Sequence, residues 1–522
     1  MNVLLFSMPD SFEHTPSLTM RMPNGALASL AGNVDAHHRV AVADLVLAQH
    51  DVPGTVTRLV HDRQPDVVGL SIMTFQRRTA ARVIALVRRL RPEALVVVGG
   101  YDPSLAPEIY EEPAMGVDVI VRGEGDLTFR DLLRAREAGA PLGTVAGLRY
   151  RDGDRFVETP PRSVSHLDGE VRPPNRGARV LSGYTLLGRQ IDIVETSRGC
   201  TYDCSFCSII EMRGRNFHTW SVERVVADIR DARDRGARAI FIVDDNITLN
   251  VARFGALCEA IVAAGLNDID YLVQGMTSAI AASGDALAAL MKKAGFRYVF
   301  LGIENVLDED LAFLRATAKN AQREHGRTVG SATQRAVDLL HRHGMLVVGG
   351  LIVGNPGDTR ESIEANLEFA RKHVDWPYIQ HPTPYPGTPM TKDFREKDLI
   401  VSDAVEEYDG TTAVVRTEHL SAEDIEFMRW RDERWMKVRH LPVVVRHDPA
   451  YVLANGLRML RHTFRGTSLR TWLGMEDERT AFRRYKDIRR REREFFPEAA
   501  AVPGILRPHG GASPAVRPAA PR

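Results

Sequence analysis

The stretch that decides the fold and the chemistry is Arg198-Gly199-Cys200-Thr201-Tyr202-Asp203-Cys204-Ser205-Phe206-Cys207. It follows directly on residues 191–195, a short apolar run typical of a buried strand. The cysteines are spaced C-x3-C-x2-C, so three thiolates on one tight loop can hold three irons of a [4Fe–4S] cubane. The fourth iron then has no protein ligand, and an open metal position is what a reaction requires. We therefore expect a catalytic cluster held by Cys200, Cys204 and Cys207.

Two other metal sites are compatible with this loop. A structural zinc site needs a fourth Cys or His nearby, and His218 is the candidate. A ferredoxin-like electron carrier needs a fourth cysteine, and only Cys258 remains in the chain. Cys258 lies within a helical pattern at 254–263 and is expected to be a buried core residue. The sparse, clustered cysteines do not form a disulfide framework, so we expect a cytoplasmic protein.

Apolar runs alternate with helical patterns around and beyond the cysteines. This alternation predicts a parallel sheet, and six such units are consistent with a partial (βα)6 TIM-type barrel. Residues at the carboxyl ends of the strands of such barrels form the site. The expected strands are 191–195, 239–243, 271–275, 298–302, 346–353 and 378–381.

At the cysteine loop and these strand ends the sequence resembles the radical S-adenosylmethionine (SAM) superfamily. The resemblance implies that the open iron chelates SAM, and that one electron cleaves SAM to methionine and a 5′-deoxyadenosyl radical. It also implies SAM-contacting groups, placing Phe206 near the adenine. The implied SAM-binding residues are Phe206, Asp244, Asp245, Glu304 and Gly354. Taken singly, the two aspartates are compatible with helix N-caps, Glu304 with a solvated residue and Gly354 with a turn.

The first 140 residues also alternate short apolar runs with helical patterns. Five expected strands, at 3–8, 40–46, 67–72, 95–98 and 117–121, fit a doubly wound, flavodoxin-like (Rossmann-like) α/β sheet. Ligands of such sheets bind beyond the carboxyl ends of the strands. The candidate residues there are Ser71, Thr74, Gly99, Gly100, Tyr101, Pro103, Glu124 and Gly125.

A flavodoxin-like domain ahead of a radical SAM barrel resembles the cobalamin (B12)-binding class of the superfamily. The resemblance assigns the strand-end residues just named to cobalamin, and small residues there would let a large corrin approach the backbone. A purely packing or regulatory role for the domain is the alternative. Methylthiotransferases carry extra cysteines in their front domain, and no cysteine precedes Cys200 here.

Residues 35–40, Asp-Ala-His-His-Arg-Val, begin like the D-x-H-x-x-G motif in which a histidine ligates cobalt. The stretch ends in Val rather than Gly, and it precedes the second expected strand instead of following the first. His37 and His38 should therefore lie in a loop at the wrong end of the sheet. The lower ligand of cobalt is not assigned.

The predicted domains are 1–140 for cobalamin, 141–185 as hairpin and linker, 186–415 as the partial barrel, 416–498 as a basic helical region, and 499–522 as a disordered tail. The whole chain is balanced, with 68 Lys+Arg and 68 Asp+Glu. Residues 429–494 hold 18 basic against 9 acidic residues, interleaved with apolar ones. This pattern is compatible with a solvated surface, or with contact to an anionic membrane and a lipid substrate. We expect no nucleic-acid binding.

The resemblance favours a methyltransferase that acts on an unactivated carbon of a small-molecule or lipid substrate, using methylcobalamin and the 5′-deoxyadenosyl radical. It also implies a flavodoxin- or ferredoxin-type electron donor. The same architecture is compatible with a radical cyclase or oxidative rearrangement enzyme. A non-enzymatic iron–sulfur sensor or electron carrier is the third hypothesis. No catalytic acid or base can be assigned from the sequence.

Overall fold

The computed structural model describes residues 1–12, 17–162, 166–324 and 327–496, with side chains omitted at 322–330. The predicted tail at 499–522 lies outside these residues. Within the described chain, every helix is too short or too polar to cross a lipid bilayer.

The front sheet has seven strands in the order β3-β1-β4-β5-β6-β7-β8. The first five are parallel and have the predicted flavodoxin-like order, while β7 and β8 form a hairpin that adds an antiparallel edge beside β6. The strands are β1 Asn2–Ser7, β3 Arg39–Asp44, β4 Val67–Ser71, β5 Leu95–Gly99, β6 Val119–Val121, β7 Leu148–Asp152 and β8 Arg155–Glu158.

Two pairs of helices cover the front sheet. Apolar side chains of α1 (Gly25–Asn33) and α6 (Gly125–Ala138) pack in one core layer, and those of α2 (Val52–Arg63) and α3 (Arg77–Leu90) pack in a second one. Short helices follow β5, namely α4 (Tyr101–Leu105) and α5 (Pro107–Glu111). Burial of both faces explains why the central strands are almost continuously apolar.

The second sheet has eight strands in the order β19-β18-β15-β14-β13-β10-β9-β2. Six parallel strands form the predicted partial barrel: β10 Arg189–Val194, β13 Ala239–Ile242, β14 Asp270–Met276, β15 Phe296–Glu304, β18 Leu346–Ile352 and β19 Trp376–Gln380. Two short antiparallel strands extend its edge, β9 Thr185–Leu186 and β2 Met20–Arg21. The β2 strand comes from the amino-terminal part of the chain, which the sequence did not indicate.

Helices follow the barrel strands and bury their apolar faces against the sheet. They are α9 Val222–Asp234, α10 Val251–Ala263, α11 Thr277–Lys293, α14 Thr333–Arg342 and α15 Arg360–His373. Shorter elements carry loop residues of the site: β11 Ser197–Arg198, α8 Ser208–Arg213, β12 His218–Thr219, α12 Asp308–Phe313, α13 Thr317–Asn320 and α16 Pro389–Glu396. A hairpin, β16 Ala321–Glu324 and β17 Arg327–Ser331, leads to α14.

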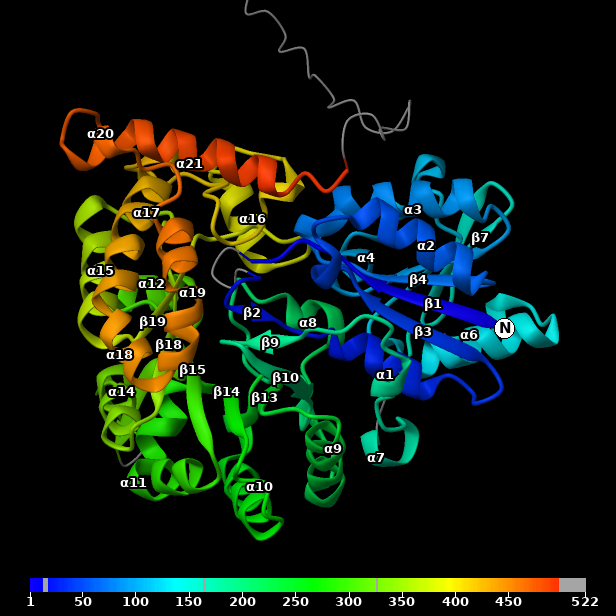
Figure 1. Ribbon diagram of the computed structural model, residues 1–522, viewed down its shortest axis with the longest axis horizontal. Coiled ribbons are helices and arrows are strands. Elements are labelled where there is room, and N and C mark those ends of the chain that lie inside the picture. The colour runs from blue at the N-terminus through cyan, green and yellow to red at the C-terminus, as the bar shows by residue number, and fades with distance from the viewer. Residues whose placement is uncertain (13–16, 163–165, 325–326, 497–522) are drawn as a thin grey trace, which may run out of the picture.

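The carboxyl-terminal region is helical, as predicted. Figure 1 shows α21 running from the barrel side of the molecule toward the front domain, where Phe496 joins the core of the front sheet. The buried ion pair between Arg489 and Asp409 ties α21 to the barrel side. The helices are α17 Ala422–Arg439, α18 Leu441–His447, α19 Pro449–Thr463, α20 Leu469–Trp472 and α21 Glu478–Glu492.

Candidate active site between the two sheets

A cavity of about 430 Å³ lies between the carboxyl ends of the front strands and the first barrel strand. Both domains contribute to its wall, which is largely apolar. Among the residues that line it are Gly69, Ser71, Gly99, Gly100, Tyr101, Glu124 and Gly125 from the front domain, and Ile193, Glu195, Arg198, Met212 and Arg213 from the barrel. Six of the eight residues predicted for cobalamin are thus brought together, whereas Thr74 and Pro103 are buried and do not line this cavity.

The turn after β5 needs a residue without a side chain. Gly100 has φ +100°, and a Cβ there would lie 2.9 Å from the carbonyl oxygen of Ile72. The backbone can follow this path only because glycine accepts a positive φ at little cost. The turn directs Tyr101 and the start of α4 toward the cavity, and burial raises the pKa of the Tyr101 hydroxyl above its ordinary range.

Helix α1 forms one wall of the cavity, and the sequence did not predict this. Asn24 caps this helix by accepting a hydrogen bond from the backbone N–H of Leu27 at 3.1 Å, and its own N–H donates to the buried carboxylate of Asp44. The Asn24 side chain also donates to Ser71 Oγ at 3.5 Å. The available signal was the Pro23-Asn24-Gly25 turn, an N-cap pattern before an apolar helix.

Arg198, just before the first cysteine, joins the two domains. Its guanidinium donates to Glu124 at 3.0 Å, to Asp126 at 2.6 Å and to Glu195 at 2.9 Å. Burial disfavours ionisation of Asp126, but the guanidinium outweighs this effect and holds the pKa of that carboxyl below its ordinary value. The start of α6 is therefore anchored to the cysteine loop by charge-assisted hydrogen bonds in a buried place.

The cysteine loop begins at the carboxyl end of β10 and is held at both ends. Gly199, with φ +90°, donates its N–H to Asp245 at 2.8 Å, and Ser205 donates its N–H to the carbonyl of Leu314 at 3.0 Å. Cys204 is buried, and Cys200 and Cys207 are half-buried. Burial raises the pKa of the Cys204 thiol to about 11 and that of Cys207 to about 12. Thiolates are thus favoured here only with a cation between them, which fits a metal cluster.

Asp244 and Asp245 follow β13 and hold different residues of the segment that leads into the cysteines. Asp244 is buried and accepts hydrogen bonds from Thr196 N–H at 2.6 Å and from the Thr196 and Ser197 hydroxyls at 2.5 Å. Burial nevertheless raises the pKa of its carboxyl to about 6. Both carboxylates therefore position the segment that leads into the cysteines.

Glu304 and Lys319 form an ion pair next to the cysteines. The Lys319 ammonium lies 2.6 Å from Glu304 Oε1 and 6.0 Å from the centre of the Phe206 ring. Glu304 ends β15 in a left-handed conformation, with φ +59°. The sequence pointed to Phe206 and Glu304, but Lys319 was missed because no motif surrounds it and only the packing of α13 brings it here.

Gly354, predicted for SAM, follows β18. It has φ +104°, and its N–H donates to Asp358 at 2.7 Å. A Cβ here would approach Ile425 on α17 to 3.1 Å, so glycine permits close contact between this strand end and the carboxyl-terminal region.

Two protein-family models match the chain in the regions that supply this site. The radical SAM superfamily model matches residues 194–370, and the B12 binding domain model matches residues 17–133. The chain belongs to the cobalamin-binding radical SAM enzymes. The predicted α/β architecture and the predicted [4Fe–4S], SAM and cobalamin cofactors agree with this membership.

Relatives of this radical SAM enzyme catalyse more than one reaction. The uncharacterized methyltransferase PH0819 of Pyrococcus horikoshii is 29% identical over 408 residues, 77% of this chain and 85% of the relative. The anaerobic magnesium-protoporphyrin IX monomethyl ester cyclase of Cereibacter sphaeroides is 28% identical over 386 residues, 72% of this chain but only 59% of the relative. The solved radical SAM methyltransferase TsrM from Kitasatospora setae, with cobalamin and a [4Fe–4S] cluster bound, superposes with a TM-score of 0.61 at 21% identity, covering 76% of this chain and 75% of that chain.

A further residue of this radical SAM enzyme, Arg213, was missed by the sequence reasoning. It ends α8, six residues after the last cysteine, and lines the cavity. Within the described part of the chain, its buried Nε and Nη1 have no hydrogen-bond partner, although Nη1 lies 3.7 Å from Glu124. A buried guanidinium with free donors fits the carbonyl or anionic groups of a large polar cofactor.

Proposed function

We propose that this enzyme transfers a methyl group to an unactivated carbon of its substrate, with cobalamin in the cavity between the sheets and the cluster on the cysteine loop. One observation carries the proposal: glycines of the front strands and residues flanking the cysteines line the same cavity. A corrin held there would lie beside the segments that flank the cysteine loop. When bound, SAM supplies the 5′-deoxyadenosyl radical and cobalamin carries the methyl group.

The proposed cluster ligands are Cys200, Cys204 and Cys207. Phe206 would offer SAM the face of its ring, and the Glu304–Lys319 pair would offer SAM a polar contact. Asp244, Asp245 and Gly354 complete the proposed SAM-binding set. Asp244 and Asp245 would act mainly through the backbone they hold. Arg213 and the strand-end residues would bind cobalamin. The burial of these cobalamin-binding residues would keep water away from a reactive radical.

The products distinguish methyl transfer from the two alternatives. A methyltransferase should release S-adenosylhomocysteine and 5′-deoxyadenosine together, whereas a cyclase should release 5′-deoxyadenosine without the homocysteine product. An electron carrier or sensor should cleave SAM slowly or not at all. The assay uses anaerobically purified enzyme with measured iron and cobalamin. Iron without cobalamin would overturn the methylcobalamin mechanism and retain the radical SAM chemistry.

The cysteine assignment has an internal control. Replacing Cys200, Cys204 or Cys207 by alanine should abolish both the iron content and 5′-deoxyadenosine formation. Cys258→Ala should keep both, because Cys258 is buried in the core between α10 and the sheet. A cluster that persists in any of the first three variants would contradict the assignment.

We further propose that the substrate is a lipid, which the enzyme reaches from the surface of an anionic membrane. Helices α18–α20 and the residues that directly follow α20 expose large apolar and basic side chains, which we call the apolar–basic surface. Leu453 and Leu457 are 89% and 83% exposed, and the spacing of Leu453, Leu457 and Leu460 places them on one helix face. The other members are Val445, Leu469, Trp472, Leu473, Met475, Arg446, Arg458, Arg461 and Arg470.

The arginines favour anionic lipid over a second copy of the chain as the partner of this surface. A symmetric dimer would bring like charges together, whereas an anionic bilayer attracts each arginine and accepts the leucines and tryptophan. Co-sedimentation with phosphatidylglycerol vesicles should be strong at low salt and weak with phosphatidylcholine. Leu453→Glu with Leu457→Glu should abolish it, while Val401→Glu, another exposed apolar position, should not. Equal binding by both variants, or dimers lost in the double variant, would contradict the proposal.

The proposal also includes a flavodoxin- or ferredoxin-type electron donor and a location in the cytoplasm. The three free cysteines on one loop support the location, because neighbouring thiols persist without forming disulfides in reducing compartments. Reduction of the cluster by a purified flavodoxin, followed by its absorbance, tests the donor.

A further inference from the structure

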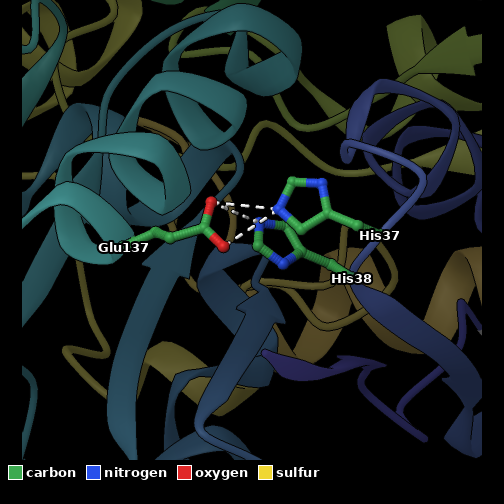
Figure 2. Close-up of side chains that lie close together, drawn as sticks. All are labelled: His37, His38 and Glu137. Atoms are coloured by element: carbon green, nitrogen blue, oxygen red, sulfur yellow. Dashed lines mark hydrogen bonds and ion pairs between the residues drawn. The ribbon is translucent and has the colours of Figure 1, made fainter.

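Two adjacent histidines and a glutamate gather at the end of the front domain that is far from the cofactor cavity. His37 and His38 lie just before β3, and Glu137 lies in the last turn of α6. Figure 2 shows both imidazoles pointing toward the Glu137 carboxylate. The amino end of α6 borders the cavity, so its 14 residues place Glu137 about 20 Å from that end. None of the three residues belongs to the site described above.

The potential ligand atoms lie close to one another. His37 Nε2 is 3.0 Å from both oxygens of Glu137, and His38 Nε2 is 3.7 Å from Oε2. One atom of each side chain lies within 4.8 Å of the others. In a tetrahedral site with bonds of about 2.0–2.1 Å, ligand atoms are about 3.3 Å apart. A small movement of the two exposed side chains, His37 and Glu137, reaches that spacing.

His38 is the observation that points to a ligand. Its side chain is 0% exposed, and its Nε2 has no hydrogen-bond partner in the part of the chain that the structure describes. The other ring nitrogen, Nδ1, is hydrogen-bonded to the nitrogen of Met1 at 3.0 Å. For Nε2 to bind a metal ion, Nδ1 must carry the ring proton and donate it to the uncharged amine of Met1, and this hydrogen bond would orient the imidazole.

We propose that His37, His38 and Glu137 bind a divalent transition-metal ion, Zn²⁺ in the first instance, with water in the fourth position. Two imidazoles and one carboxylate form a ligand set suited to borderline cations such as zinc, and poorly suited to Mg²⁺ or Ca²⁺. The ion would fasten the loop before β3 to the end of α6, two segments that are 100 residues apart in the chain. It would be separate from the cluster and from cobalamin.

The alternative is a simple surface ion pair. His37 and Glu137 are 57% and 46% exposed, and pairs between exposed groups contribute little to stability. The ion pair, however, leaves the buried Nε2 of His38 3.7 Å from Glu137 and without a hydrogen bond among the described residues, whereas a metal ion satisfies it.

The test measures zinc directly, on tag-free protein with its iron–sulfur cluster assembled. The protein is dialysed against zinc chloride, and zinc and iron are counted together by mass spectrometry, because vacant cysteines would also bind zinc. We expect one zinc per chain at full iron content. His37→Ala and Glu137→Gln should weaken zinc binding about 10–100-fold without loss of iron. Both positions are exposed, so these variants should fold.

His61→Ala is the matched control. His61 is an exposed histidine of the same domain beside a carboxylate, Asp62, at 3.2 Å. Within the described chain, no third ligand joins that pair. Zinc should raise the thermal unfolding midpoint of the wild type and of His61→Ala, but not of His37→Ala. Equal zinc content in all four proteins, or no zinc at full iron content in the wild type, would overturn the proposal.

Discussion

Arg198 donates a hydrogen bond to Asp126 at 2.6 Å across the boundary between the two domains, and both side chains are almost fully buried. Arg198 enters from the segment before the first cysteine, and Asp126 from the first turn of α6. Because Asp126 also accepts from Ser29 on α1, one carboxylate ties together the cysteine loop and two helices of the front domain. Both residues also line the cavity, so we expect its geometry to depend on this connection.

Replacing Arg198 by methionine should destabilise the protein by about 3–5 kcal/mol, because Glu124, Asp126 and Glu195 would be left without their shared cation. Denaturant unfolding under anaerobic conditions measures the change. Arg215→Met is the control, since Arg215 forms an exposed pair with Asp203 at 3.5 Å and should contribute less than about 1 kcal/mol. Equal losses in the two variants would contradict the role given to Arg198.

Gly99→Leu should reduce the cobalamin content of the purified enzyme while leaving its iron content unchanged. A Cβ at Gly99 would make only ordinary contacts with Val121, at 3.5 and 3.6 Å, so the backbone should accept a side chain. The added leucine would instead occupy the cavity that Gly99 lines. Gly169→Leu, at an exposed glycine of α7 (Leu167–Glu170) with open space around it, is the comparison. Normal cobalamin in Gly99→Leu would place the cofactor elsewhere.

Lys319→Met should weaken SAM binding about tenfold or more, because it removes a charge-assisted contact and leaves the Glu304 carboxylate buried without its partner. Equilibrium dialysis with cluster-loaded enzyme measures the affinity, and iron analysis confirms that the cluster is intact. Lys292, on the exposed side of α11, provides the control variant Lys292→Met. An unchanged affinity of Lys319→Met for SAM would show that the Glu304–Lys319 pair has only a structural role.

The stability of the protein should depend on the ionisation of Asp10. Burial raises the pKa of this carboxyl to about 7, against the opposing effect of a hydrogen bond from Thr79 at 3.1 Å. The unfolded value is about 3.9, so between about pH 4 and 7 the folded state binds the proton more tightly. The contribution of Asp10 to the free energy of unfolding therefore falls as the pH rises through that window.

Asp10→Asn should remove this dependence and make the protein more stable than the wild type at pH 8, by about 1–3 kcal/mol. Unfolding midpoints measured from pH 5 to 8 provide the comparison. Asp62→Asn, at an exposed carboxylate of the same domain, should follow the wild type. Parallel curves for Asp10→Asn and the wild type would show that burial does not perturb this group.

The sequence by itself determined the features that local patterns encode. The spacing of Cys200, Cys204 and Cys207 along one loop predicts the cluster, and the alternation of apolar runs predicts both parallel sheets. The structure confirms both sheets, because side-chain periodicity depends on neighbours within a few residues. The three cysteine ligands stay a prediction from their spacing. The same reasoning placed His37 and His38 before the second front strand, away from the cavity, as the structure has them.

Only the tertiary structure decided which distant residues meet. Arg198 meets Glu124 and Asp126 across more than 70 positions, Lys319 reaches Glu304 through the packing of α13, and the imidazole of His37 meets Glu137 at the end of another helix. Several of these residues stand in recognisable stretches of sequence, but no pattern names their partners, because each contact is set by how whole elements pack together. The packing of these elements determines which charged groups meet inside the protein, and the spacing of residues along the chain does not encode that packing.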